Sequence, residues 1–232
     1  MALSKSQLDQ GKAPVLPAYR KLQRALLAAC IALGPIAFTL YVISWNDVSR
    51  GLITTSATVG ATANLLHFVS GFAASFFLPL GYLGMALLGM RRSPWLATIS
   101  AMLGFLGWIP FAALVGIDDL AYDIALRGSN PQLAALWTYF NGDPLMNAYL
   151  LVYAAGHLLS TMLLGILLGR TRLIPIWAIW ALIVSSPLTI IAFIDGQHYR
   201  SIVAPIVCVL LLLGCLPATF AMAKNKDEEG LV

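Results

Sequence analysis

The chain has 232 residues, of which 59% are hydrophobic and only 10% are charged, and its formal net charge is +4. Soluble domains usually carry about 25% charged residues, and a soluble protein of this size has too little interior to hide so much apolar surface. The composition therefore excludes an ordinary soluble domain and predicts an integral membrane protein. The basic residues form no stripe and sit at the ends of apolar runs, so nucleic acid is not an expected partner.

Six apolar runs are long enough to cross a bilayer, for which a helix needs about 20 residues. They are continuous and do not alternate, which predicts helices and excludes a closed β-barrel. In chain order the runs cover residues 25–45, 63–90, 95–117, 145–168, 174–193 and 202–223. The predicted fold class is all-α, a polytopic integral membrane protein with six transmembrane helices. Its predicted parts are an N-terminal segment 1–24, a membrane domain 25–223 and a tail 224–232.

The distribution of Lys and Arg predicts the orientation of these helices. One side of the predicted bundle holds Lys5, Lys12, Arg20, Lys21, Arg24, Arg91, Arg92, Arg170, Arg172, Lys224 and Lys226, and the other side holds Arg50, Arg127 and Arg200. Basic residues favour the cytoplasmic side, so both termini are expected in the cytoplasm. The connections on that side are very short, and we expect a multi-pass protein of a bacterial plasma membrane.

The third run continues into an acidic stretch, GIDDLAYDIAL, at residues 116–126. Asp119 and Asp123 are one helical turn apart, and Arg127 is one turn beyond Asp123. This spacing favours a helix that continues past the membrane on the outer side.

Two cap signals follow in the outer connection. Asn130 precedes Pro131, and Asp143 precedes Pro144. A capping side chain followed by proline in the first turn is typical of a helix start. We therefore predict a short interfacial helix between the third and fourth spanning helices, and a second helix start just before the fourth run.

Several polar residues fall inside the apolar runs. His157 lies about 12 residues into the fourth run, near the predicted bilayer centre. Tyr149, Tyr153, His157 and Thr161 recur every four residues and form a polar stripe. Such a stripe either bonds neighbouring helices or lines a cavity, and the sequence leaves both readings open.

A second histidine, His67, lies near the outer end of the second run. Asn64, Gly71 and Ser75 share its helix face, which also suits simple helix packing. His67 and His157 are expected to differ by roughly 10 Å in depth, too far apart to hold one zinc ion. The sequence thus predicts no metal and no cofactor.

Motifs exclude some classes of enzyme. The only glutamates are Glu228 and Glu229 in the tail, so no HExxH metalloprotease is present. No lysine lies in a spanning run, which excludes a retinal Schiff base. The phosphate-binding motif GxxxxGK[ST] and the nucleophile motif GxSxG of serine hydrolases are also absent.

The remaining polar residues gather on the predicted outer side and suggest an intramembrane pocket. Its chemistry would be acid–base, with buried carboxyl and imidazole groups. The predicted catalytic residues are Asp119, Tyr153, His157 and Asp195. The predicted substrate contacts are His67, Trp108, Asp118, Asp123, Tyr149, His198 and Arg200.

Three functions fit these observations. The first is a pocket, open to the outer side, that binds or transforms a lipophilic small molecule. The second is a small transporter or channel with an acidic outer vestibule. The third is a non-catalytic accessory membrane subunit. Membrane lipid is an expected partner in each case, and the sequence does not determine the oligomeric state.

Overall fold

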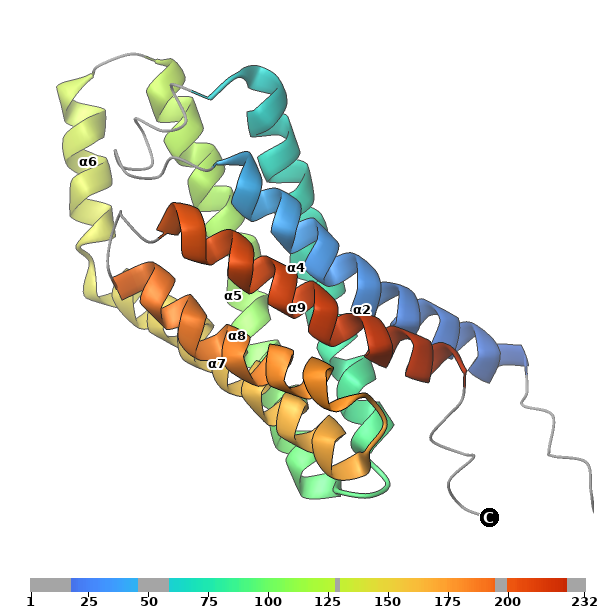
Figure 1. Cartoon of the computed structure of the whole chain (residues 1–232). Helices are drawn as coiled ribbons and strands as arrows, with labels where there is room; N and C mark the ends of the chain where they lie inside the picture. The colour runs from blue at the N-terminus through green and yellow to red at the C-terminus, as the bar shows by residue number, and fades with distance from the viewer. Residues whose placement is uncertain (1–17, 46–58, 128–129, 195–199, 225–232) are drawn as a thin grey trace, which may run out of the picture.

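The computed structural model describes residues 18–45, 59–127, 130–194 and 200–224, and for residues 193, 194, 200 and 201 it describes the backbone alone. Within these ranges the fold is all-α (Figure 1). In chain order the helices are α2 (Ala18–Ser44), α4 (Ala61–Gly89), α5 (Pro94–Leu126), α6 (Pro131–Asn141), α7 (Pro144–Thr171), α8 (Ile176–Ile194) and α9 (Arg200–Ala223).

Five of the described helices, α2, α4, α5, α7 and α9, are long and apolar enough to cross a membrane. Helix α8 is also apolar but shorter. Its 19 residues span about 28 Å at 1.5 Å per residue, close to the thickness of a bilayer core. Helix length and hydropathy thus confirm a multi-pass helical membrane protein, while six complete crossings remain a prediction.

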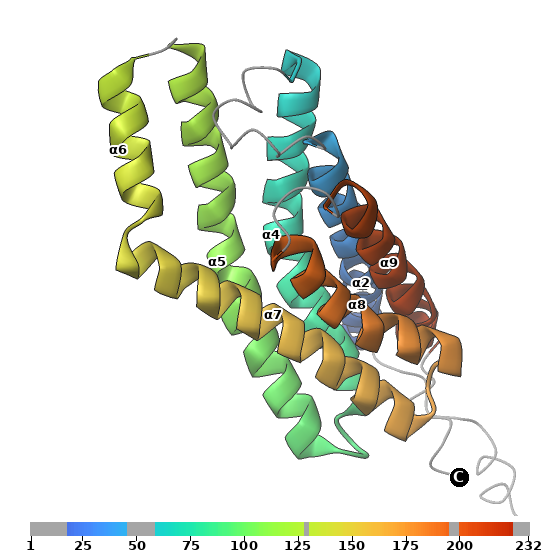
Figure 2. The same cartoon turned by 60° about the vertical axis from the view of Figure 1, so that its left-hand side comes forward.

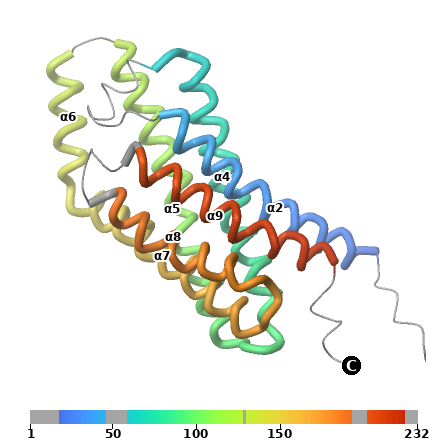
Figure 3. Tube along the Cα trace, in the orientation of Figure 1, coloured from blue at the N-terminus to red at the C-terminus, as the bar shows by residue number. Residues whose placement is uncertain are grey.

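The long helices run up and down along a common direction. Helix α2 packs against α4 and α9, α5 packs against α4 and α7, and α8 lies between α7 and α9 (Figures 1 and 2). The start of α2 and the end of α9 lie at one end of the bundle, together with the tight turns that join α4 to α5 and α7 to α8 (Figure 3). We call this the terminal end, and the end that carries α6 the far end.

The far end follows the predicted caps closely. Helix α5 continues to Leu126, nine residues beyond the apolar run, as the acidic spacing predicted. The side chain of Asn130 accepts a hydrogen bond from the Gln132 backbone N–H at 3.0 Å. The side chain of Asp143 likewise accepts a hydrogen bond from the Leu145 backbone N–H at 2.8 Å and caps the start of α7.

Helix α6 turns back beside the last turns of α5 (Figure 2). Trp137 of α6 packs there against Ala121 and Ile124 of α5, in a small cluster of its own. This contact holds the extension of α5 in place above the main core.

Helices α5 and α7 touch through their backbones. A Cβ atom added at Gly156 would lie 2.6 Å from the Gly107 Cα, closer than real Cβ contacts occur. Ser160 of α7 also donates a hydrogen bond to the Ser100 carbonyl oxygen of α5, at 2.6 Å. The crossing brings Trp108 and His157 together, with ring centroids 5.0 Å apart.

Candidate functional site

A cavity of about 270 Å³ lies in the far half of the bundle. All seven described helices contribute to its lining, but most of its wall is aromatic or aliphatic. Its apolar lining includes Phe38, Phe111, Leu114, Leu150, Val207 and Cys208. A concave, mainly apolar space with a few polar groups is the usual form of a small-molecule site.

The polar residues of the wall include Asn141, Thr189 and a buried histidine–aspartate pair. His67 Nε2 of α4 lies 3.2 Å from Asp118 Oδ2 of α5. The two residues are only 3% and 8% exposed. The Tyr41 hydroxyl group of α2 donates to the same carboxyl oxygen at 2.6 Å, so three helices meet at Asp118.

The imidazole ring of His67 is fixed on both faces and at both nitrogens. Tyr41 stacks on one face at a centroid distance of 4.1 Å, and Trp45 stacks on the other at 3.8 Å with the planes only 2° apart. Nδ1 lies 2.9 Å from the Tyr41 carbonyl oxygen. A carbonyl oxygen can only accept a hydrogen bond, so Nδ1 carries a proton.

The hydrogen-bond partners of His67 and Asp118 favour one total charge for the pair. With Nδ1 protonated, a bare Nε2 would set its lone pair against a carboxylate oxygen, which is repulsive. One further proton therefore lies between Nε2 and Oδ2, on either atom. The pair is an imidazolium beside a carboxylate or a neutral imidazole beside a carboxylic acid, and its total charge is zero in both cases.

Trp45 is held in turn by Asn64, one helical turn before His67 on α4. Its Nε1–H donates to Asn64 Oδ1 at 2.7 Å, and the Asn64 amide donates to the Val59 carbonyl oxygen at 3.1 Å. Asn64 and Trp45 are 1% and 4% exposed. Buried and bonded in this way, the two side chains keep the ring of His67 in its place.

A second cavity of about 20 Å³, enough for roughly one water molecule, lies deeper in the bundle. It shares Tyr153 with the larger cavity, and Trp108 and His157 also line it. His157 Nδ1 donates to the Tyr153 carbonyl oxygen at 2.6 Å, so the structure gives His157 a partner within its own helix. The indole N–H of Trp108 is buried and has no hydrogen-bond partner among the described residues.

Two of the four residues in the polar stripe on α7, Tyr149 and Thr161, bond neighbouring helices. The Tyr149 hydroxyl group donates to the Pro110 carbonyl oxygen of α5 at 3.0 Å. Thr161 bonds the Tyr82 hydroxyl group of α4 and the His157 carbonyl oxygen. Of the four stripe residues, only Tyr153 reaches the larger cavity.

The predicted catalytic residues separate in the structure. Tyr153 lines both cavities and His157 lines the smaller one. Asp119 is exposed on α5 and lines neither cavity. Asp195 lies outside the described residues.

The predicted substrate contacts separate in the same way. His67 and Asp118 line the larger cavity, and Trp108 lines the smaller. Asp123 is exposed, and Tyr149 is half-buried outside both cavities. His198 lies outside the described residues, and of Arg200 only the backbone is described.

Tyr41 and Trp45 complete the site, and neither is among the site residues predicted from the sequence. One signal was available: they are four residues apart on one helix, near the same predicted membrane face as His67. Within the described ranges, no three His, Cys, Asp or Glu side chains group closely enough to hold a metal ion.

Comparison of the chain with models of protein families, with curated proteins and with solved structures finds no match. Its function therefore has to be inferred from the geometry of the cavity and its buried pair.

Proposed function

We propose that this protein binds a small lipophilic molecule in the larger cavity, with Asp118 and His67 as its polar recognition point. The observation that carries the proposal is a buried, proton-sharing pair on the wall of an otherwise apolar space. Ionisable groups inside a membrane bundle are costly and usually serve a function. A pair with a purely structural role could be packed on all sides, whereas this pair lines a cavity.

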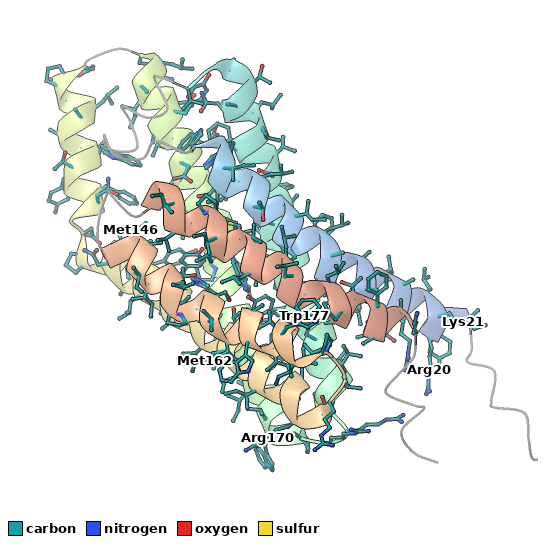
Figure 4. The ribbon with its side chains drawn as sticks, viewed as in Figure 1. Arg20, Lys21, Met146, Met162, Arg170 and Trp177 are labelled. Atoms are coloured by element: carbon teal, nitrogen blue, oxygen red, sulfur yellow. The ribbon has the colours of Figure 1, made fainter. Side chains whose placement is uncertain are left out.

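The charge distribution supports an outward-facing site. Eight basic residues of the described chain lie at the terminal end, and two, Arg127 and Arg200 at the start of α9, lie at the far end. Those at the terminal end are Arg20, Lys21, Arg24, Arg91, Arg92, Arg170, Arg172 and Lys224. Figure 4 shows Arg20, Lys21 and Arg170 there, and Met146, which lines the cavity, toward the other end. By the positive-inside rule the terminal end is cytoplasmic. In this proposal the membrane is a plasma membrane, and α8 crosses it as the sixth transmembrane helix.

The aromatic and apolar residues of α6 fit this orientation. Leu136, Tyr139 and Phe140 are exposed on that helix. Side chains of this kind favour the boundary between lipid and water. We therefore place α6 at the outer interface, beside the cavity to which Asn141 contributes.

A closed floor favours a binding site over a transport path. Toward the terminal end, Leu164, Leu167 and Leu168 of α7 are fully buried. A Cβ atom added at Gly89 of α4 would lie 2.5 Å from the Leu167 side chain, so the helices leave no room there. The packed half of the bundle supports a pocket that opens on one side only.

We assign to Asp118 the acid–base role that the sequence suggested for Asp119 and Asp195. Asp118 is the described carboxyl group that lines the cavity, and it shares a proton with His67. Acid–base chemistry on a bound molecule would therefore begin with this shared proton.

The test is binding of radiolabelled naphthalene, a neutral apolar probe, to the full chain in lipid nanodiscs, with empty nanodiscs as background. Ala204 of α9 lines the cavity, and Ala204→Phe places a ring inside it. Val209→Phe, on the same helix, adds a ring at a site that is 51% exposed. We expect saturable binding in the wild type and in Val209→Phe and its loss in Ala204→Phe. Equal binding by all three proteins would refute the proposal.

A further inference from the structure

The geometry points to a ligand class: a neutral lipophilic alcohol or phenol whose hydroxyl group donates a hydrogen bond to Asp118 Oδ1. This inference rests on the proposed function and adds to it the chemistry of the ligand. It follows from Asp118 Oδ1, the polar atom of the buried pair that has no hydrogen-bond partner among the described residues.

Asp118 Oδ1 is that atom. Both hydrogen bonds to this carboxyl group, from Tyr41 and from His67, end on Oδ2. No described residue bonds Oδ1, and it is not among the buried polar atoms that are shut off from solvent. Because Asp118 lines the cavity, Oδ1 is available to a molecule bound there.

Oδ1 can only accept a hydrogen bond. The shared proton lies between Oδ2 and His67 Nε2, so Oδ1 is a carboxylate oxygen or the carbonyl oxygen of a carboxylic acid. His67 itself offers nothing to a ligand, since both its nitrogens and both its ring faces are occupied. A ligand must therefore bring its own donor.

The charge of the cavity selects a neutral donor. The His67–Asp118 pair carries no net charge, and no lysine or arginine is among the described residues that line the space. A cationic amine would be buried without a net counter-charge, and an anion would meet an acceptor oxygen. Burial of an unpaired charge in an apolar space is strongly unfavourable.

Aromatic rings define the body of the ligand. Phe38, Tyr41, Phe111 and Tyr153 lie on the cavity wall, and the Phe111 and Tyr153 rings stack with centroids 5.7 Å apart. Flat aromatic or conjugated ligands pack well against such walls. The ligand must therefore donate a hydrogen bond, carry no charge and pack against aromatic rings. A hydroxyl group on a compact apolar skeleton meets all three requirements.

Competition against radiolabelled naphthalene in nanodiscs tests the inference with four probes of one skeleton. They are 2-naphthol, 2-methoxynaphthalene, 2-naphthoate and 2-naphthylmethylamine, compared at equal free concentration. We expect 2-naphthol to compete about tenfold more strongly than 2-methoxynaphthalene, which has no donor. The anion and the cation should both compete more weakly than 2-naphthol.

Variants then connect the preference to the Asp118 carboxyl group. Asp118→Ala should abolish the advantage of 2-naphthol over 2-methoxynaphthalene. Asp119→Ala, which removes an exposed carboxylate at the next position, should keep it. If Asp118→Ala does not fold, the four-probe comparison on the wild type still decides.

The outcomes separate the inference from the function it rests on. Equal competition by 2-naphthol and 2-methoxynaphthalene, or stronger competition by the cation, overturns the inference and leaves a lipophile site. If Ala204→Phe binds naphthalene as well as the wild type does, the cavity is not the binding site and the proposed function is refuted.

Discussion

The contact between α5 and α7 gives the most direct test of the fold, through the substitution Gly107→Ala. The added methyl group would overlap the backbone nitrogen of His157 and lie 2.6 Å from the carbonyl carbon of Gly156. Neither is the flexible end of a side chain, so the two helices must move apart. Overpacking of this kind costs about 1–3 kcal/mol.

A matched control lies on the same helix. Gly116 has no heavy atom within 4 Å of an added Cβ, and Gly116→Ala should stabilise the helix slightly. Both substitutions gain the same helical propensity, so the difference between them isolates the packing cost. Gly107→Ala should therefore have a free energy of unfolding about 1–3 kcal/mol below that of Gly116→Ala.

Thermal unfolding of the two variants in one detergent, followed by intrinsic fluorescence, measures this difference. For a chain of this size we expect the midpoint of Gly107→Ala to be roughly 2–12 °C lower. Midpoints within about 1 °C of each other would show that the backbones of α5 and α7 are not in contact, contrary to the structure.

Three further predictions concern the buried pair and the orientation. Asp118→Ala leaves the buried imidazole of His67 without its partner and should lower the free energy of unfolding by about 3–5 kcal/mol. Asp119→Ala should change the free energy of unfolding by less than about 0.5 kcal/mol. Similar losses in both variants would contradict the burial of Asp118. In protein labelled with ¹⁵N-histidine, the His67 signal, assigned by its loss in His67→Gln, should show a proton on Nδ1; a bare Nδ1 would contradict the hydrogen bond to the Tyr41 carbonyl oxygen. On a background without the native cysteines, a membrane-impermeant thiol reagent should label Arg127→Cys from outside the cell and Arg91→Cys only after lysis; labelling of both in intact cells would refute the topology.

Local signals in the sequence predicted the helices and their starts. The caps at Asn130 and Asp143 depend on a side chain and the next two or three residues, so no tertiary contact was needed to find them. The extension of α5 followed in the same way from charges one turn apart.

The identity of the cavity carboxyl group depended on packing that the sequence does not show. Asp118 and Asp119 are adjacent and point about 100° apart around α5. In the structure Asp118 continues the buried series of Phe111 and Val115, spaced by four and three residues, while Asp119 faces outward. Because nearly every residue of this run is apolar, periodicity alone could not tell the buried face from the lipid face.

The meeting of three helices at Asp118 was equally hidden. Gly71 of α4 leaves space for the Tyr41 ring, since a Cβ atom there would lie 2.7 Å from it. That close approach brings the end of α2 against His67, and it depends on residues far apart in the chain. The sequence had marked Gly71 for helix packing without naming the helix that it would contact.

The parallel stacking of Trp45 on His67, at 3.8 Å and 2°, also makes the site visible by spectroscopy. A protonated imidazole is electron-poor and quenches the emission of an indole ring in van der Waals contact. Trp45 is therefore a native fluorophore stacked on the imidazole ring that shares this proton with Asp118. In a chain that keeps Trp45 as its single tryptophan, the emission intensity would report each change in that proton's position, including one caused by a molecule arriving at Asp118.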